Sequence, residues 1–127
     1  MNAKVKIESL HGDEDPIVVS YDGVWDTLDG EEHVKYGDGN VLTIRDGEVI
    51  IDENGQMKAH ILLRPDGEIR LTPFETSMGT LLFGIETHYL RVVKISGKMV
   101  VEAGYSLLAD GEPVNRVEMI ITVRRCR

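Results

Sequence analysis

The longest segment with alternating apolar and polar side chains spans residues 71–95. From its middle onward, one set of alternate positions is mainly apolar: Leu81, Phe83, Ile85, Thr87 and Tyr89. The set between them reads Thr80, Leu82, Gly84, Glu86 and His88. A period of two predicts a strand with one face in a core and the other toward water. Because the segment exceeds the usual length of a strand, we predict a bend or a bulge within it, at Gly84.

Shorter alternating segments occupy most of the remaining chain. They cover residues 4–10, 17–22, 32–36, 41–45, 48–52, 57–64, 68–72, 98–108 and 116–124. Turn dipeptides separate several of them: Asp22-Gly23, Asp29-Gly30, Asp46-Gly47 and Asn54-Gly55. No segment combines helical periodicity with helix caps. About ten strands with turn signals every ~8–14 residues predict an antiparallel barrel or sandwich.

The phase of the strands predicts which apolar side chains form the core. The predicted inward-facing residues of the late strands are Leu81, Phe83, Ile85, Met99, Val101, Val117, Met119, Ile121 and Val123. Other apolar residues are predicted to face outward: Leu42, Ile44, Leu62, Leu82, Leu108 and Ile120. If these outward residues are contiguous, they form an apolar surface of the kind that marks a protein interface.

Composition and charge narrow the classes of partner. The chain has 127 residues, 42% hydrophobic and 28% charged, which is typical of one folded domain. Its net charge is −8, whereas nucleic acids and anionic membranes attract basic surfaces, so we predict neither as a partner. Residues 1–55 carry 14 acidic and 4 basic side chains, a charge of −10, and residues 56–127 carry 8 and 10, a charge of +2. We interpret the uneven charge as one that keeps the protein soluble and attracts the two halves of the chain to each other.

Cysteine content and the first residues bear on the cellular compartment. Cys126 is the only cysteine, so neither an internal disulfide nor a cysteine-based zinc site is predicted. The first residues contain no apolar signal segment, and no window of the sequence approaches membrane-spanning length. We therefore expect a cytoplasmic protein.

Two stretches late in the chain carry a resemblance to a known family. Thr76–Gly79 followed by Leu82–Thr87 resembles its threonine, aromatic and glycine stretch, and Tyr105–Leu107 followed by Gly111–Asn115 resembles its last hairpin. The chain thus resembles the YwiB-like bacterial proteins, a family of unknown function with a calycin-like (lipocalin-type) β-barrel. The resemblance implies an all-β fold: an antiparallel calycin-like barrel of about 8–10 strands, with residues 1–127 as a single domain.

The chain departs from the family pattern at two positions. Ser77 stands where members often have a proline after the threonine, and Asn54 stands where members often have an arginine before the glycine of the middle hairpin. If that arginine serves a site in the family, this chain lacks it. The resemblance implies a fold and a cavity, and it implies no established reaction.

The sequence contains no motif that assigns a reaction. A phosphate-binding glycine loop, a nucleophile elbow, a pair of metal-binding histidines on one helix and an EF-hand are all missing. Three polar clusters are interpreted as solvated surface: Glu86 with His88, Glu31-Glu32-His33, and Asp13-Glu14-Asp15. We therefore predict no catalytic residue, no metal site and no cofactor, and an enzyme is the weakest interpretation of this sequence.

The tyrosines are the most informative polar residues. Tyr21, Tyr36, Tyr89 and Tyr105 fall in the apolar phase of their strands, and a buried tyrosine hydroxyl needs a hydrogen-bonding partner. Two interpretations stay open. In the first, the barrel interior binds a small apolar or amphipathic molecule, and the predicted ligand-binding residues are Trp25 near the mouth, Tyr36, Thr87, Tyr89 and Tyr105. In the second, the tyrosines are packing residues and the outer surface forms an interaction site, for example in a homodimer.

Overall fold

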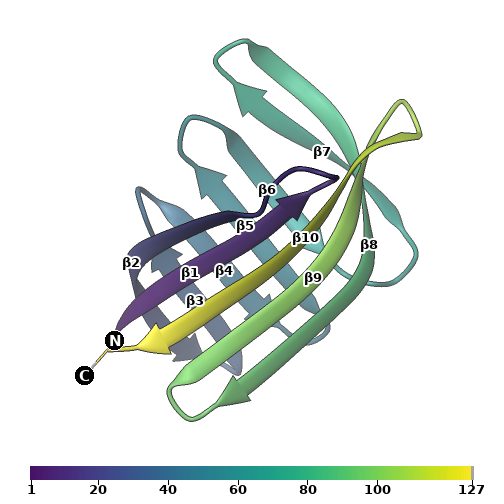
Figure 1. Ribbon diagram of the computed structural model, residues 1–127. Helices are drawn as coiled ribbons and strands as arrows, with labels where there is room; N and C mark the ends of the chain where they lie inside the picture. The colour runs from purple at the N-terminus through teal and green to yellow at the C-terminus, as the bar shows by residue number, and fades with distance from the viewer. Residues whose placement is uncertain (127) are drawn as a thin grey trace.

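The computed structural model describes residues 1–126, which form a closed antiparallel β-barrel without helices (Figure 1). Its ten strands are β1 (Asn2–His11), β2 (Ile17–Leu28), β3 (Glu31–Tyr36), β4 (Asn40–Arg45), β5 (Glu48–Asn54), β6 (Lys58–Leu63), β7 (Ile69–Thr76), β8 (Gly79–Ile95), β9 (Lys98–Ala109) and β10 (Glu112–Arg125). Each strand pairs with the next along the chain, and β1 pairs with β10 to close the barrel. The predicted antiparallel barrel of about ten strands is confirmed.

The up-and-down order places successive turns at opposite ends of the barrel. We call one end the mouth; its turns are residues 12–16, 37–39, 55–57, 77–78 and 110–111. We call the opposite end the base; it contains residues 29–30, 46–47, 64–68 and 96–97, together with the starts of β1 and β9 and the end of β10.

Alternate residues of the strands fill the interior and form the core. Six of the residues predicted to face inward are buried there: Ile85, Met99, Val101, Val117, Ile121 and Val123. Phe83 and Met119 are half-buried and pack against this core. The prediction for Leu81 is wrong, because 53% of this residue is exposed. Leu81 lies opposite Phe74 near the tip of the β7–β8 hairpin, which extends beyond the rest of the barrel (Figure 1).

The predicted outward positions are also partly wrong. Leu42 and Ile44 are buried in the interior, where Leu42 lies between Val34 and Ile51 on the neighbouring strands. β4 is short and carries apolar residues in both phases, so its alternation did not define the inner face. Leu108 faces outward but is only 7% exposed, because it packs beside Gly84 on the outer wall. Leu82 and Ile120 are exposed and Leu62 is half-buried.

The central segment bends at a different place from the predicted one. Residues 77–78 form a turn that separates β7 from β8, and the side chain of Thr76 supports it by accepting from the Met78 amide at 3.1 Å. The bulge in β8 falls at His88, since Thr87 pairs with Tyr105 and Tyr89 pairs with Gly104. An extra residue reverses the phase of the strand beyond it. Gly84 therefore is not the bend.

The bulge determines the position of Tyr89. Its ring lies on the outer wall over Gly104, where an added β-carbon would be only 2.3 Å from the Cε1 atom of Tyr89. Tyr89 is accordingly 40% exposed. The prediction that Tyr89 faces the interior is wrong, because it assumed an unbroken period of two, and the bulge adds one residue that shifts the following side chains to the other face.

Asp22-Gly23 lies within β2 rather than in the predicted turn. Gly23 pairs with Ala3 on one side and Tyr36 on the other, and a β-carbon there would lie 2.6 Å from the Lys35 carbonyl oxygen. The glycine therefore permits a close approach of two strands, which is the other common reason for a glycine inside a strand.

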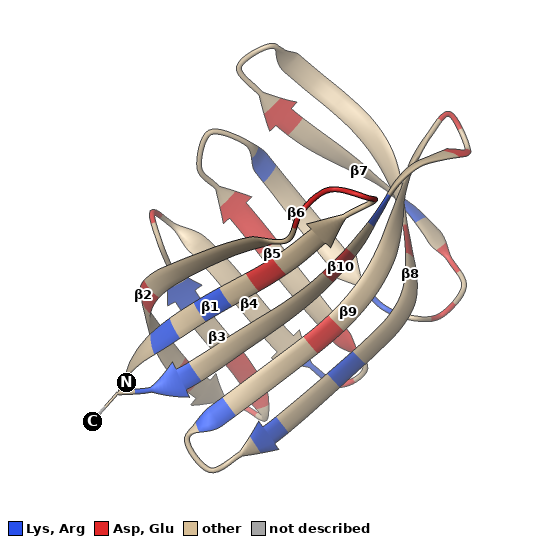
Figure 2. Cartoon of the chain, in the orientation of Figure 1, with Lys and Arg blue, Asp and Glu red and all other residues tan. Residues whose placement is uncertain are grey.

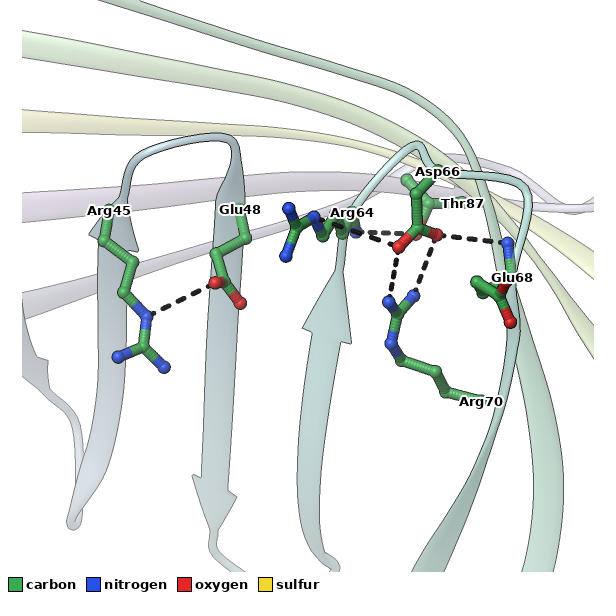
Figure 3. Close-up of polar contacts among 7 residues, drawn as sticks. All are labelled: Arg45, Glu48, Arg64, Asp66, Glu68, Arg70 and Thr87. Carbon is green, nitrogen blue, oxygen red and sulfur yellow. Dashed lines mark hydrogen bonds and ion pairs between the residues drawn. The ribbon is translucent and has the colours of Figure 1, made fainter.

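The weakest part of the barrel wall is the ladder between β6 and β7. Only Lys58 with Glu75 and Ala59 with Phe74 are paired, both near the mouth. Toward the base the two strands separate, and the Arg64 amide instead donates to Oγ1 of Thr87 on β8 at 3.0 Å (Figure 3).

Asp66 organises the connection between β6 and β7. Its carboxylate accepts hydrogen bonds from both terminal nitrogens of Arg70, at 3.1 and 2.5 Å, and from the Glu68 amide at 3.1 Å (Figure 3). The hydrogen bonds from Arg70 and the Glu68 amide lower the pKa of Asp66 to about 2. The connection is therefore held by a charged turn where the ladder is missing.

Because the β7–β8 hairpin extends beyond the barrel, we expect two leucines in the inward phase to differ in how much their replacement by alanine lowers the free energy of unfolding. Leu63→Ala empties a fully buried position and should lower the free energy of unfolding by about 2–5 kcal/mol. Leu81→Ala, the matched control at a half-exposed position, should change it by less than about 0.5 kcal/mol. Denaturant titration of the two variants measures both values. Equal losses would mean that the hairpin packs onto the core.

Candidate functional site

A cavity of about 290 Å³ opens at the mouth of the barrel. It is lined by Ile7, Ser9, Val19, Tyr21, Tyr36, Asn40, Glu53, Gly55, Gln56 and Met57. Its strand residues lie in the inward phase: Ile7 pairs with Val19, and Tyr21 pairs with the buried Val5. The cavity is thus the outer part of the barrel interior. Its size is at the lower limit of ordinary ligand sites, which suits a small molecule.

Tyrosine hydroxyls supply the polar points of this interior. Tyr36 and Tyr105 are each only 5% exposed, and the Tyr36 ring lies 5.2 Å from that of Tyr21, inclined by 57°. No described residue forms a hydrogen bond with either hydroxyl. Within residues 1–126, no fully buried side-chain nitrogen or oxygen lacks a partner. Both hydroxyl oxygens therefore retain contact with open space.

Glu53 is the carboxylate of this site. It pairs with the buried Ala59 across β5 and β6, so its side chain enters the interior, where it is half-buried. Burial raises the pKa of Glu53. Burial, followed by the negative charge of Glu53, also raises the pKa values of Tyr36 and Tyr105, which keeps both phenols protonated. The arrangement offers one carboxylate and hydroxyl donors beside the apolar side chains of Ile7, Val19 and Met57.

The sequence analysis missed Glu53, although the pattern contained a signal. In β5 the inward phase reads Val49, Ile51 and Glu53, so the carboxylate continues an apolar series at the mouth end of a strand. A charged residue in the apolar phase of a strand either ends the core or belongs to a site.

The base is filled by a buried polar network. Glu32 is 5% exposed, and its carboxylate accepts from Trp25 Nε1 at 2.8 Å, Thr27 Oγ1 at 2.5 Å and Lys94 Nζ at 2.6 Å. The Arg125 guanidinium lies 4.3 Å from the Trp25 ring centroid, within range of a cation–π interaction. Burial alone would raise the pKa of Glu32, but these hydrogen bonds and the charge of Lys94 lower it overall. Access to the interior is therefore from the mouth.

Of the five predicted ligand-binding residues, Tyr36 lines the cavity, whereas Tyr105 is buried in the barrel interior outside the cavity lining, although the charge of Glu53 still acts on it. Trp25 was expected near the mouth but lies at the base, 2% exposed and bonded to Glu32. Thr87 faces inward and is buried, and its hydroxyl accepts from the Arg64 amide. Tyr89 lies on the outer wall, as described above.

The remaining polar clusters do not converge. Glu32 points inward, while Glu31 and His33 lie on the opposite face of β3 with Oε1 and Nε2 3.4 Å apart. His88 is exposed, as predicted, with Nε2 2.6 Å from Oγ of Ser106. The described part of the chain contains no group of three His, Cys, Asp or Glu side chains arranged for a metal ion.

A larger hollow, of about 810 Å³, lies along β1 to β4 on the barrel wall. Three of its lining residues are glycines, and its Lys4 is already paired with Asp22. The interior site is the better candidate, because there a half-buried carboxylate and tyrosine side chains meet apolar side chains in one concave space.

Comparisons with known proteins identify the fold and a family. The profile described as a domain of unknown function (DUF1934) matches residues 4–121. The crystal structure of the ywiB protein from Bacillus subtilis is similar, with a TM-score of 0.84 and 17% identity over 99% of this chain and 92% of that chain. At that identity the likeness shows the fold alone. No curated protein matches the sequence. Within residues 1–126 there is no helix long and apolar enough to cross a membrane.

The base network predicts a pH-dependent stability. Because the pKa of Glu32 in the folded protein lies below its ordinary value of 4.5, its ionised form stabilises the fold above that pH, and the effect is lost as the pH falls through the folded pKa. At neutral pH, Glu32→Gln should cost about 1.5–3 kcal/mol. In denaturant titrations the difference from wild type should shrink as the pH is lowered below 4.5 and through the folded pKa of Glu32. Glu31→Gln is the control; a cost independent of pH would contradict the role of the ionised carboxylate.

Proposed function

This chain belongs to the DUF1934 family, whose function is unknown, and we propose that its barrel binds a small, largely apolar molecule at the mouth. One observation carries the proposal: the hydroxyl of Tyr36, which has no described protein partner, and the carboxylate of Glu53 meet in one concave space at the mouth of the barrel. Apolar walls with a few converging polar groups are the usual composition of a ligand site.

The chemistry of the lining supports binding rather than catalysis. Ile7, Val19 and Met57 supply apolar contact area, and the tyrosines supply donors that orient a polar head group. The cavity residues include no histidine, cysteine or lysine; Glu53 and the tyrosines are its titratable groups, and we assign them the role of hydrogen-bonding partners for the ligand.

Pure packing would explain the tyrosines less well. Phenylalanine would fill the same space without a hydroxyl that needs a partner. Filled barrels of similar strand number exist, and others hold one small ligand, so strand number does not decide between the two.

A second candidate function is self-association through the β7–β8 hairpin. Leu71 and Leu82 are 71% and 57% exposed on its outer face, and Leu81 is 53% exposed on its inner face. An isologous pairing of two hairpins would cover both sets.

The ligand proposal predicts a selective effect of one hydroxyl. A neutral naphthylamine dye that fluoresces in apolar surroundings should bind the purified chain, and 1-hexanol should displace it. Tyr36→Phe should weaken hexanol binding by about 0.5–1.5 kcal/mol, the net value of one hydrogen bond, because its hydroxyl lies in the cavity without a described protein partner. Tyr89→Phe, the control on the outer wall, should leave it unchanged. Absence of dye binding, or equal losses in both variants, would contradict the proposal.

Native mass spectrometry of gently purified protein separates the two candidate functions. A small additional mass on a monomer supports the ligand proposal. A dimer that Leu82→Ser converts to monomer supports self-association, because this substitution removes an exposed apolar contact without touching the cavity. A bare monomer would contradict self-association and leave the dye experiment to decide the ligand proposal.

A further inference from the structure

We propose that the ligand of this interior site carries a protonated amine, with Glu53 as its counter-ion. The inference rests on the proposed function and names the chemical class of the ligand. It starts from a charged group that the fold itself leaves without a partner.

Glu53 has no compensating cation in the part of the chain that the structure describes. No lysine, arginine or histidine among residues 1–126 forms an ion pair with it. The side chain nevertheless enters the barrel interior beside Tyr36 and the apolar walls of the cavity. A carboxylate in such surroundings loses hydration and gains nothing unless a cation or hydrogen-bond donors meet it. A glutamine or an apolar residue would fit the same position at lower cost.

The other inward carboxylate shows how this fold compensates such a group. Glu32, at the base, accepts three hydrogen bonds, one of them from Lys94. No comparable cation comes from the strands that face Glu53: β3 presents Tyr36, β2 presents Tyr21 and β6 presents Ala59. The contrast points to a cation supplied from outside the chain.

The neighbours of Glu53 favour an organic ammonium group. Tyrosine ring faces attract cations, and neutral phenol oxygens accept hydrogen bonds from an ammonium group. Tyr21, Tyr36 and Tyr105 supply such rings and oxygens in the same interior. A metal ion would need several convergent oxygen, nitrogen or sulfur ligands, and the described residues hold no such group of acidic, histidine or cysteine side chains.

The rim of the mouth has the matching charge. Its turns contain five acidic residues and neither lysine nor arginine: Asp13, Glu14, Asp15, Asp38 and Asp110. Two of these acidic turns, β1–β2 and β9–β10, are visible in Figure 2, where lysines and arginines gather mainly toward the start of β1 and the end of β10, although Lys58 lies at the start of β6 beside the mouth. A negative rim raises the local concentration of cations at the entrance and repels anions.

The test uses three ligands that share one tail. Hexylamine, protonated at neutral pH, is compared with 1-hexanol and hexanoate by displacement of the neutral dye and by calorimetry. The charge-assisted contact should make hexylammonium bind roughly tenfold more tightly than hexanol, with hexanoate the weakest. In Glu53→Gln the amine and the alcohol should bind within about twofold of each other. Glu102→Gln removes the same charge from the outer wall and should keep the tenfold preference.

The outcomes separate the two proposals. If hexanol displaces the dye as well as hexylammonium does, the amine inference is wrong and the proposed function stands. If hexanoate binds most tightly, the inference is wrong as well. If the dye does not bind, or if it binds and none of the three ligands displaces it, both proposals fail. The order of the three affinities in the unmodified chain tests the amine inference even if Glu53→Gln does not fold. If Glu53→Gln folds and still binds hexylammonium about tenfold more tightly than hexanol, Glu53 is not the counter-ion.

Discussion

The pairing of β1 with β10 is the interaction on which the rest of the structure depends. It joins nine residue pairs, from Ala3 with Arg125 to His11 with Val117, and converts a meander of hairpins into a closed wall. Closure removes the exposed sheet edges there and gives every strand an inner face. Without it the interior would have neither a base nor a mouth.

In a closed barrel, burying an inward polar group without a hydrogen-bonding partner costs free energy. The inward polar groups at the two ends of this barrel differ in whether they have such partners. At the base, Glu32 is saturated with donors from Trp25, Thr27 and Lys94. At the mouth, Glu53 and the tyrosine hydroxyls face accessible space. The first arrangement is that of a structural network, and the second is the one on which the proposed ligand site rests.

Alternation and turn chemistry predicted the fold class, the number of strands and much of the late core, because inward residues such as Met99, Val101 and Ile121 repeat with period two. The same reasoning failed where one residue changes the phase. The bulge at His88 carries Tyr89 to the outer wall, and nothing in a two-residue period reveals it. Asp22-Gly23 was equally ambiguous, since glycine serves both turns and close strand contacts. Tyrosine phase identified Tyr36 in the candidate site; it did not identify Glu53, because a glutamate at the end of a strand is usually solvated.

The short β6–β7 ladder has a consequence for how the molecule can be divided. The two strands share only two residue pairs, and the turn at residues 64–68 connects them at the end where they are not paired. A cleavage in that turn leaves one piece with β1–β6 and another with β7–β10, which still meet along the long β1–β10 ladder. Neither piece can close a barrel alone, and each presents an unsatisfied edge that only the other matches. The chain is therefore built as two complementary halves, the arrangement required of a split protein that regains its shape when its fragments are brought together.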